Sequence, residues 1–263
     1  MTINNPTPIG EAIRLTRIWQ DHGPNTYPLD INQLIAGMFQ PGSFDSSLKV
    51  KYKNLTSIEG CLVRTPNTND WTIALSSNAA NLRRQRFTYA HELGHFMCHR
   101  KLRNEFNDNQ DSLNNFFDPI ENEANIFASW LLMPANLVRN EFSQCSWDVK
   151  NLRKMGVRFE ASLQASALRY VDVCEKPVAF VVSRDGMIVW SRKSSNAPFM
   201  TAYQNGDELP EGSIAKSLSK NSLECGVVQK CGRAWSPICG ATESNHFDTS
   251  YLEFQYTCIT FTG

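Results

Sequence analysis

With 263 residues, the chain is long enough to form one compact domain and a second, smaller one. Its 26 lysine and arginine residues balance 26 aspartate and glutamate residues, so it lacks the basic excess of a dedicated nucleic-acid-binding protein. No stretch approaches the roughly 18 consecutive apolar residues of a membrane-spanning helix. We therefore expect an ordinary globular protein with no direct nucleic-acid partner and no membrane contact.

The N-terminal sequence and the cysteines indicate a cytoplasmic protein. Residues 1–6 contain neither the basic segment nor the apolar segment of a secretory signal. The eight cysteines form no C-x-x-C pair, and we interpret them as reduced thiols that are mostly buried. A second metal site at Cys225, Cys231 and Cys239 is an alternative, although their spacing matches no zinc-binding pattern.

Two helices and then three strands are predicted in the N-terminal part of the chain. Residues 9–20 place apolar side chains at helical spacing, and Asp30 is a suitable N-cap for a shorter helix that extends to Met38. From Leu48 onward the apolar residues recur at every second position, which favours strands. The predicted strands are 48–52, 58–64 and 71–75. We expect them to form a small antiparallel sheet.

Residues 87–99 carry the motif His-Glu-x-x-His at positions 91–95. In an α-helix, His91 and His95 lie about one turn apart on the same face, so both imidazoles can reach one metal ion. Glu92 lies about 100° further round the helix, where it can contact a water on the metal without being a ligand. We therefore identify Glu92 as a candidate general base. The motif fixes only three letters, so a chance match is the alternative.

Other residues of this segment need their own interpretation. Glycine costs about 1 kcal/mol relative to alanine inside a helix, so Gly94 requires the close approach of a second helix or of a substrate. His99 lies about 12 Å beyond His91 along the helix axis, too far for both to bind one ion. We expect His99 to be a residue at the helix end. The residues that follow, 104–115, are rich in asparagine, aspartate and glutamine and are predicted to form a loop.

A third metal ligand is expected on a second helix, at residues 118–133. Asp118 is a suitable N-cap for this helix. Two carboxylates, Glu121 and Glu123, are candidate ligands. We favour Glu121, because it shares a helix face with Asn125, whose amide can hydrogen-bond the carboxylate. Glu121 can instead complete a capping box with Asp118, and Glu123 remains the alternative ligand.

The two motifs together closely resemble the ImmA/IrrE family of zinc metallopeptidases. The matching segments are Arg-Phe-Thr-Tyr-Ala-His-Glu-Leu-Gly-His at 86–95, Glu-Asn-Glu-Ala-Asn-Ile-Phe-Ala at 121–128 and Leu-Leu-Met-Pro at 131–134. The resemblance implies a zinc ion bound by His91, His95 and Glu121, the first glutamate of the second motif, with Glu92 as the catalytic base. It is strong over residues 9–171 and weak or absent towards the C-terminus.

The order of elements and the resemblance together predict an α+β fold with a zincin-like catalytic domain, in which the small sheet accompanies the two motif helices. We assign residues 1–173 to this domain with a helical extension, and residues 174–263 to a small C-terminal α+β module of unknown role. The extension is predicted to contain helices at 135–142, 147–155 and 159–171. The module is predicted to contain a hairpin at 178–191, where Asp-Gly suits a type I′ turn, and a terminal strand at 251–262.

The resemblance implies an endopeptidase that cleaves a regulatory protein at a specific site, such as a repressor with a helix-turn-helix, and so acts in transcription regulation and stress response. A competing hypothesis is a non-hydrolytic, zinc-stabilised interaction module that binds a repressor or an antitoxin-like partner. Glu92 favours the enzyme, because a purely structural zinc site needs no general base. We also hypothesise that the edge of the sheet pairs with an extended substrate.

Overall fold

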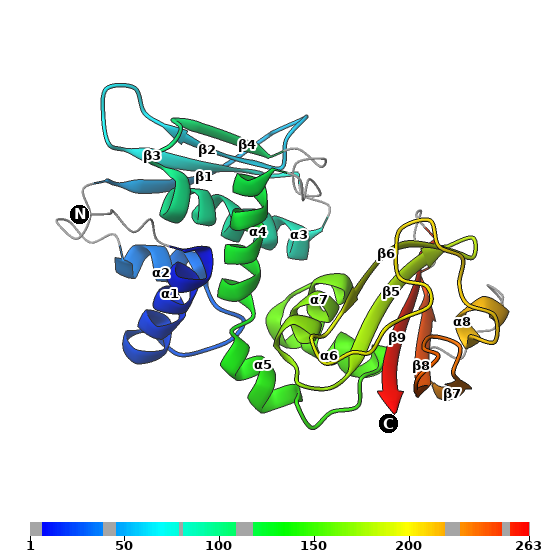
Figure 1. Cartoon of the computed structure of the whole chain (residues 1–263). Coiled ribbons are helices and arrows are strands. Elements are labelled where there is room, and N and C mark those ends of the chain that lie inside the picture. The colour runs from blue at the N-terminus through cyan, green and yellow to red at the C-terminus, as the bar shows by residue number, and fades with distance from the viewer. Residues whose placement is uncertain are drawn as a thin grey trace, which may run out of the picture. The chain divides into compact units, whose positions relative to one another are not determined.

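The computed structural model describes residues 7–38, 46–78, 81–108, 118–218, 227–248 and 253–262. The chain forms two compact units, of which the first comprises Met1–Pro134 with Arg158–Ser162, and the second Ala135–Val157 with Leu163–Gly263. Each unit combines helices with one β-sheet, which confirms the predicted α+β fold class (Figure 1). Within the described ranges, no helix is long and apolar enough to span a membrane.

The first unit begins with two capped helices. Helix α1 spans Pro8–His22 and is capped by the hydroxyl of Thr7. Helix α2 spans Ile31–Met38, and the Asp30 carboxylate caps it as predicted. Both helices bury their apolar faces in the core of this unit, which is what the helical spacing of their apolar residues requires.

The sheet of the first unit is mixed, not purely antiparallel as predicted. Its strands are β1 (Leu48–Lys53), β2 (Gly60–Arg64), β3 (Trp71–Ser76) and β4 (Glu105–Asp108), in the order β1-β3-β2-β4. β2 pairs antiparallel with β3 and β4, whereas β1 runs parallel to β3. The chain reverses direction between β1 and β2 and again between β2 and β3, so β1 and β3 point the same way. In the sheet, β3 lies between β1 and β2, so β1 pairs directly with β3.

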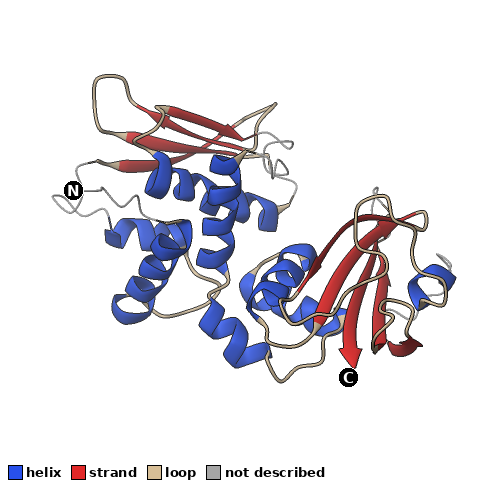
Figure 2. Ribbon diagram, viewed as in Figure 1, coloured by secondary structure: helices blue, strands red, loops and turns tan. Residues whose placement is uncertain are grey.

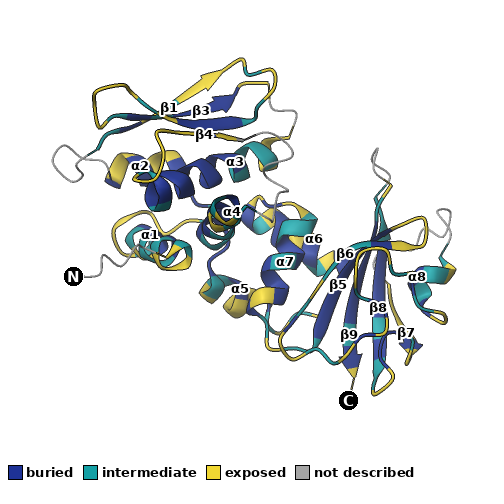
Figure 3. Ribbon diagram, turned by 45° about the horizontal axis from the view of Figure 1, so that its top comes forward, coloured by how far each residue is buried: buried dark blue, intermediate teal, exposed yellow. Residues whose placement is uncertain are grey.

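Two packed helices carry the sequence motifs. Helix α3 spans Leu82–Gly94 and continues into a π-helical turn, η1, at His95–His99, while α4 spans Pro119–Leu132. Helix α3 packs beneath the sheet, against β2 and β3, and α4 crosses it and packs against it (Figure 2). Every residue from Thr88 to Gly94 is buried (Figure 3). A Cβ at Gly94 would lie only 2.9 Å from the Phe127 ring, so this glycine permits the close helix approach that its position predicts.

The second unit is built on a five-stranded antiparallel sheet. Its strands are β5 (Val178–Arg184), β6 (Met187–Lys193), β7 (Val228–Gly232), β8 (Gly240–Phe247) and β9 (Gln255–Thr262), in the order β6-β5-β9-β8-β7, and a short helix α8 (Ile214–Ser217) precedes β7. The predicted hairpin is formed by β5 and β6. Its turn residues Asp185 and Gly186 have φ angles of 53° and 80°, as a type I′ turn requires. β9 is the predicted terminal strand.

Three helices precede this second sheet: α5 (Ala135–Phe142), α6 (Val149–Phe159) and α7 (Leu163–Val173). They belong almost entirely to the second unit. Trp147 shows the physical reason, because its indole N–H donates to the carbonyl of Ala179 at 3.0 Å and its ring stacks on Tyr170. The division into compact units therefore differs from the expected boundary between residues 173 and 174. Helical periodicity indicates a buried face but not which sheet covers it.

Candidate metal centre

The two histidines of the His-Glu-x-x-His motif meet at the junction of α3 and η1. His91 and His95 are both 0% exposed, and their Nε2 atoms lie 2.9 Å apart. About one helical turn separates the two residues, so their rings lie close together, with centroids 4.6 Å apart. The helix thus brings both imidazoles to one point, as the spacing of the motif predicts.

Glu121 of α4 reaches the same point. Its Oε2 lies 3.2 Å from Nε2 of His91 and 3.5 Å from Nε2 of His95. One ligand atom from each of these three residues lies within 4.8 Å of the other two. In the part of the chain that the structure describes, no other group of three or more His, Cys, Asp or Glu residues has this geometry. The packing of α4 on α3 therefore supplies a third ligand position.

Glu123, the alternative ligand, contacts a different partner. Its Oε2 lies 2.9 Å from Nε2 of His99, and its side chain is 49% exposed. Residues two apart on an α-helix are separated by about 200° around the axis, so Glu121 and Glu123 point in different directions. The geometry therefore favours Glu121 as the carboxylate ligand.

Hydrogen bonds outside the cluster determine which ring nitrogens face into it. Nδ1 of His91 lies 2.9 Å from the amide oxygen of Asn125, an acceptor, so Nδ1 carries the proton of the neutral ring. Sequence reasoning expected Asn125 to contact the glutamate; its amide oxygen contacts the histidine. A neutral imidazole has one N–H, so Nε2 of His91 presents a lone pair to His95 and Glu121. A lone pair on Nε2 of His91 repels the carboxylate of Glu121 at 3.2 Å, and it repels a second lone pair on Nε2 of His95, unless a cation lies between these atoms.

The charge of the cluster fits such a cation. Burial raises the pKa of the Glu121 carboxyl, but its contacts with His91 and His95 outweigh burial and hold its pKa well below the ordinary value. The carboxylate therefore contributes a negative charge that suits a bound cation. Two imidazole nitrogens and one carboxylate oxygen are also the protein ligands of many catalytic zinc sites. The residues present therefore fit a divalent metal ion.

Glu92 follows His91 on α3 and is not one of the three members of the cluster. Its side chain is 0% exposed and faces β2, where a Cβ at Gly60 would lie 3.0 Å from Oε1 of Glu92. The same Cβ would lie 2.5 Å from Cγ2 of Thr88, so only glycine fits this position of β2. Gly60 thus leaves space for the carboxylate, which suits a general base that does not bind the ion.

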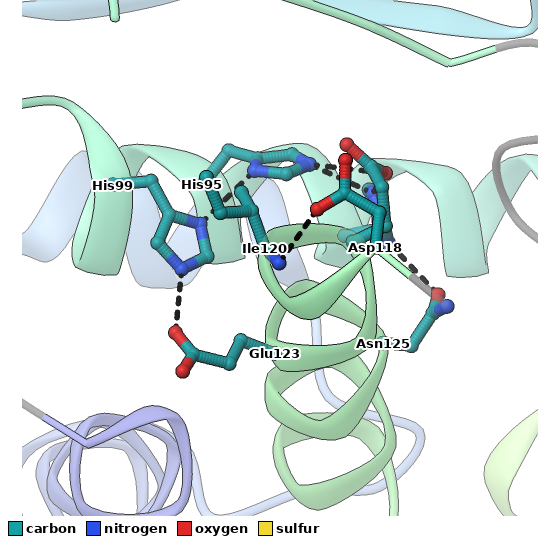
Figure 4. A network of polar contacts seen from close by, with 8 residues as sticks. His95, His99, Asp118, Ile120, Glu123 and Asn125 are labelled. Atoms are coloured by element: carbon teal, nitrogen blue, oxygen red, sulfur yellow. Dashed lines mark hydrogen bonds and ion pairs between the residues drawn. The ribbon is translucent and has the colours of Figure 1, made fainter. Parts of the chain in front are cut away.

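Two residues beside the cluster were not placed there by sequence reasoning. His99 is the last residue of η1, as expected of a helix-end residue, but it is 2% exposed and its Nδ1 lies 3.0 Å from Nδ1 of His95, so it is also a buried neighbour of the cluster (Figure 4). Phe106 of β4 stacks on the ring of His95, with centroids 4.4 Å apart. The four-residue spacing from His95 is the sequence signal for His99. Phe106 gave no signal, because its segment was predicted to be a loop.

A cavity of about 320 Å³ borders α3 but is not lined by the metal cluster. Its walls include Asn32, Arg86 and Tyr89. The Tyr89 hydroxyl donates to the side-chain oxygen of Asn32 at 2.8 Å, and burial raises the pKa of this phenol. Tyr89 is thus engaged with α2, and we assign the cavity no part in the metal chemistry.

The fold of the first unit and its cluster of His91, His95 and Glu121 are those expected of a zincin-like domain. Residues 45–170 match the peptidase family M78, described as the IrrE N-terminal-like domain. This match supports the resemblance to the ImmA/IrrE family that was inferred from the two motifs.

One solved structure extends the comparison to most of the chain. A Mycobacterium tuberculosis transcriptional regulator is similar with a TM-score of 0.55 and 17% sequence identity, over 95% of this chain and 76% of that one. At this identity the similarity concerns the fold alone. No curated protein sequence matches the chain.

Proposed function

We propose that this protein is a zinc-dependent endopeptidase. The observation that carries the proposal is the buried cluster of His91, His95 and Glu121, with Glu92 adjacent to it on α3. A bound zinc ion would supply Lewis-acid activation of water and of the scissile carbonyl. The match to a peptidase family supports this reaction class.

Glu92 is the proton carrier of the proposed reaction. Its carboxylate takes a proton from the attacking water and delivers it to the leaving amine. The space that Gly60 leaves on β2 accommodates this carboxylate, and Glu92 is not a member of the three-residue cluster.

Strand β4 is the proposed binding site for the substrate backbone. It is an edge strand of the first sheet, and its Phe106 stacks on His95. An extended peptide that adds to this edge would pass beside the metal cluster and would be held by main-chain hydrogen bonds. A structure with a bound peptide that makes no backbone pairing to β4 would reject this part of the proposal.

The proposed substrate is a regulatory protein, such as a helix-turn-helix repressor, cleaved at a specific site in the cytoplasm. The family match and the shared fold of a transcriptional regulator support a role in transcription regulation. A role in stress response is part of the same proposal and rests only on the resemblance of the two motifs. Such a role requires contact with a protein partner and not with nucleic acid, in keeping with the balanced charge of the chain.

The test is cleavage of a panel of purified repressors by the zinc-supplied protein, with Glu92→Gln as the comparison. We expect the wild type to produce discrete fragments of one repressor. Glu92→Gln should keep its zinc and lose about 10²–10⁴-fold in rate, because general acid–base catalysis contributes about that much. An equal cleavage rate in both proteins would contradict the assigned role.

One observation favours a second function, the non-hydrolytic interaction module. His91, His95 and Glu92 are all 0% exposed, as in a metal site that stabilises a fold. In that case a repressor or an antitoxin-like protein would bind without being cut. Stable complex formation between the wild type and a repressor that stays intact in the presence of zinc would favour this function over the endopeptidase.

A further inference from the structure

Beyond the three proposed ligands, a chain of hydrogen-bonding contacts runs outward from the cluster through His99. Nδ1 of His95 lies 3.0 Å from Nδ1 of His99, and Nε2 of His99 lies 2.9 Å from Oε2 of Glu123 (Figure 4). His99 is buried, whereas the carboxylate of Glu123 is about half exposed. The contacts therefore connect a buried ring at the metal cluster to a carboxylate at the surface.

Two features of the structure hold the rings of His95 and His99 in place. His95 to His99 form a π-helical turn, and the two rings face each other with centroids 5.2 Å apart. Phe106 of β4 stacks on His95 and lies 6.2 Å from the ring of His99. Both imidazoles are thus held in place by packing, and their hydrogen bonds only decide where the protons lie.

The position of each proton follows from the acceptor at the outer end. A carboxylate oxygen is a hydrogen-bond acceptor, so Nε2 of His99 donates to Oε2 of Glu123. A neutral imidazole has one N–H, so Nδ1 of His99 is an acceptor and Nδ1 of His95 is the donor. The single N–H of His95 is then used on its outer side, and its Nε2 presents a lone pair to His91 and Glu121.

We propose that His99 and Glu123 are positioning residues that fix the tautomer of His95 for metal binding. They do for His95 what Asn125 does for His91, whose Nδ1 donates directly to the amide oxygen. Two separate outer acceptors thus turn two Nε2 lone pairs toward one point. This inference rests on the metal site of the proposed function, but it concerns protons that are in place before any metal binds.

The test compares substitutions that keep or remove the acceptor that faces His95. His99→Leu removes it, whereas His99→Asn places an amide oxygen close to the original position of Nδ1. Glu123→Ala removes the outer carboxylate without touching His95. Glu105→Gln is the control for the loss of a negative charge, because Glu105 is an acidic residue of β4 whereas Glu123 lies on α4. Circular dichroism and thermal unfolding of the metal-free proteins identify variants that do not fold.

The first readout is the zinc dissociation constant, measured by competition with a chromophoric chelator. We expect His99→Leu to weaken zinc binding by about 10–100-fold, the usual cost of losing an outer hydrogen-bond partner. His99→Asn should recover most of this loss. Glu123→Ala should lose a smaller factor, because the Glu123 carboxylate is half exposed and water can take its place. Glu105→Gln should match the wild type. Wild-type affinity in a folded His99→Leu protein would overturn the inference.

The second readout is the ring ¹⁵N chemical shifts of His95 in the metal-free protein, which distinguish the two neutral tautomers. We expect protonated Nδ1 in the wild type and a mixture of tautomers in Glu123→Ala. An unchanged tautomer in a folded Glu123→Ala protein would overturn the inference even if His99→Leu fails to fold, whereas His99→Asn, which keeps an acceptor for Nδ1 of His95, should retain the wild-type tautomer. If the wild type shows the expected tautomer but binds no zinc, the proposed metal site fails while the assignment of the positioning residues stands.

Discussion

The two motif helices, α3 and α4, carry three glutamates, and each of these has a different environment. Glu92 is fully buried against β2, Glu121 contacts both imidazoles from α4, and Glu123 contacts His99 with half of its side chain exposed. Sequence reasoning placed Glu92 from its position inside the motif. It favoured Glu121 over Glu123 but could not exclude either, because the face that α4 turns toward α3 depends on tertiary packing.

The two candidate ligands can be separated by matched substitutions. Glu121→Gln removes a charge from the centre of the cluster, so we expect zinc affinity to fall by more than the roughly 10–100-fold typical of an outer partner. Glu123→Gln, with the same change of charge on the same helix, should lose less. Competition with a chelator measures both dissociation constants. A larger loss in Glu123→Gln than in Glu121→Gln would transfer the ligand role to Glu123.

At the scale of elements, the site depends on how closely α3 and α4 approach each other. Gly94 lies where the two helices touch, and its missing side chain leaves room for the fully buried ring of Phe127. The same approach brings Glu121 of α4 within reach of the motif histidines. A glycine that lowers helix propensity is therefore retained by packing, which is the explanation that the sequence already suggested.

Gly94→Ala tests this packing. The added Cβ would improve helix propensity by about 1 kcal/mol, but overpacking against a buried ring costs about 1–3 kcal/mol, so we expect a net loss of stability. Zinc affinity should fall as well, because α4 must shift. Gly37→Ala in α2 is the control: a Cβ there meets no atom within 4 Å, and we expect a gain of up to about 1 kcal/mol. Urea unfolding measures both changes, and a stabilised Gly94→Ala protein would contradict the account.

The helices were more predictable than the first sheet. Caps at Asp30 and Asp118 and the Asp-Gly turn of the hairpin act locally, so the sequence carries them directly. β4 was missed because its four residues have low strand propensity and are held by pairing with β2. The parallel pairing of β1 with β3 depends on strand order, which no local pattern encodes. For the same reason Phe106 could not be placed on His95.

At the scale of the whole molecule, the chain is two compact units, and all three proposed ligands lie in the first. Sequence reasoning assigned the helices between Ala135 and Val173 to the first domain, whereas most of these residues belong to the second compact unit. An apolar helix face fits either sheet, so the pattern alone does not distinguish the two. Contacts such as the hydrogen bond from Trp147 to Ala179 connect this region to the second sheet, and they join residues that are distant in the sequence.

Metal binding should therefore stabilise one unit selectively. A ligand that binds the folded state stabilises the element that holds it, so zinc should slow amide exchange in α3 and α4. We expect exchange in β5 and β9 of the second sheet to stay the same with and without zinc. Hydrogen–deuterium exchange with mass spectrometry, before and after chelation, measures both regions. If zinc slowed amide exchange equally in α3 and α4 and in β5 and β9, that result would contradict a site built only from the first unit.

The most direct test of zinc binding by His91, His95 and Glu121 is the amount of bound metal per chain, measured by elemental analysis on the wild type beside His95→Ala. We expect a single zinc ion in the wild type and its loss in a folded His95→Ala protein. Well-folded wild type that binds no metal when zinc is supplied would contradict the endopeptidase proposal, because Glu92 would then have no activated water to deprotonate.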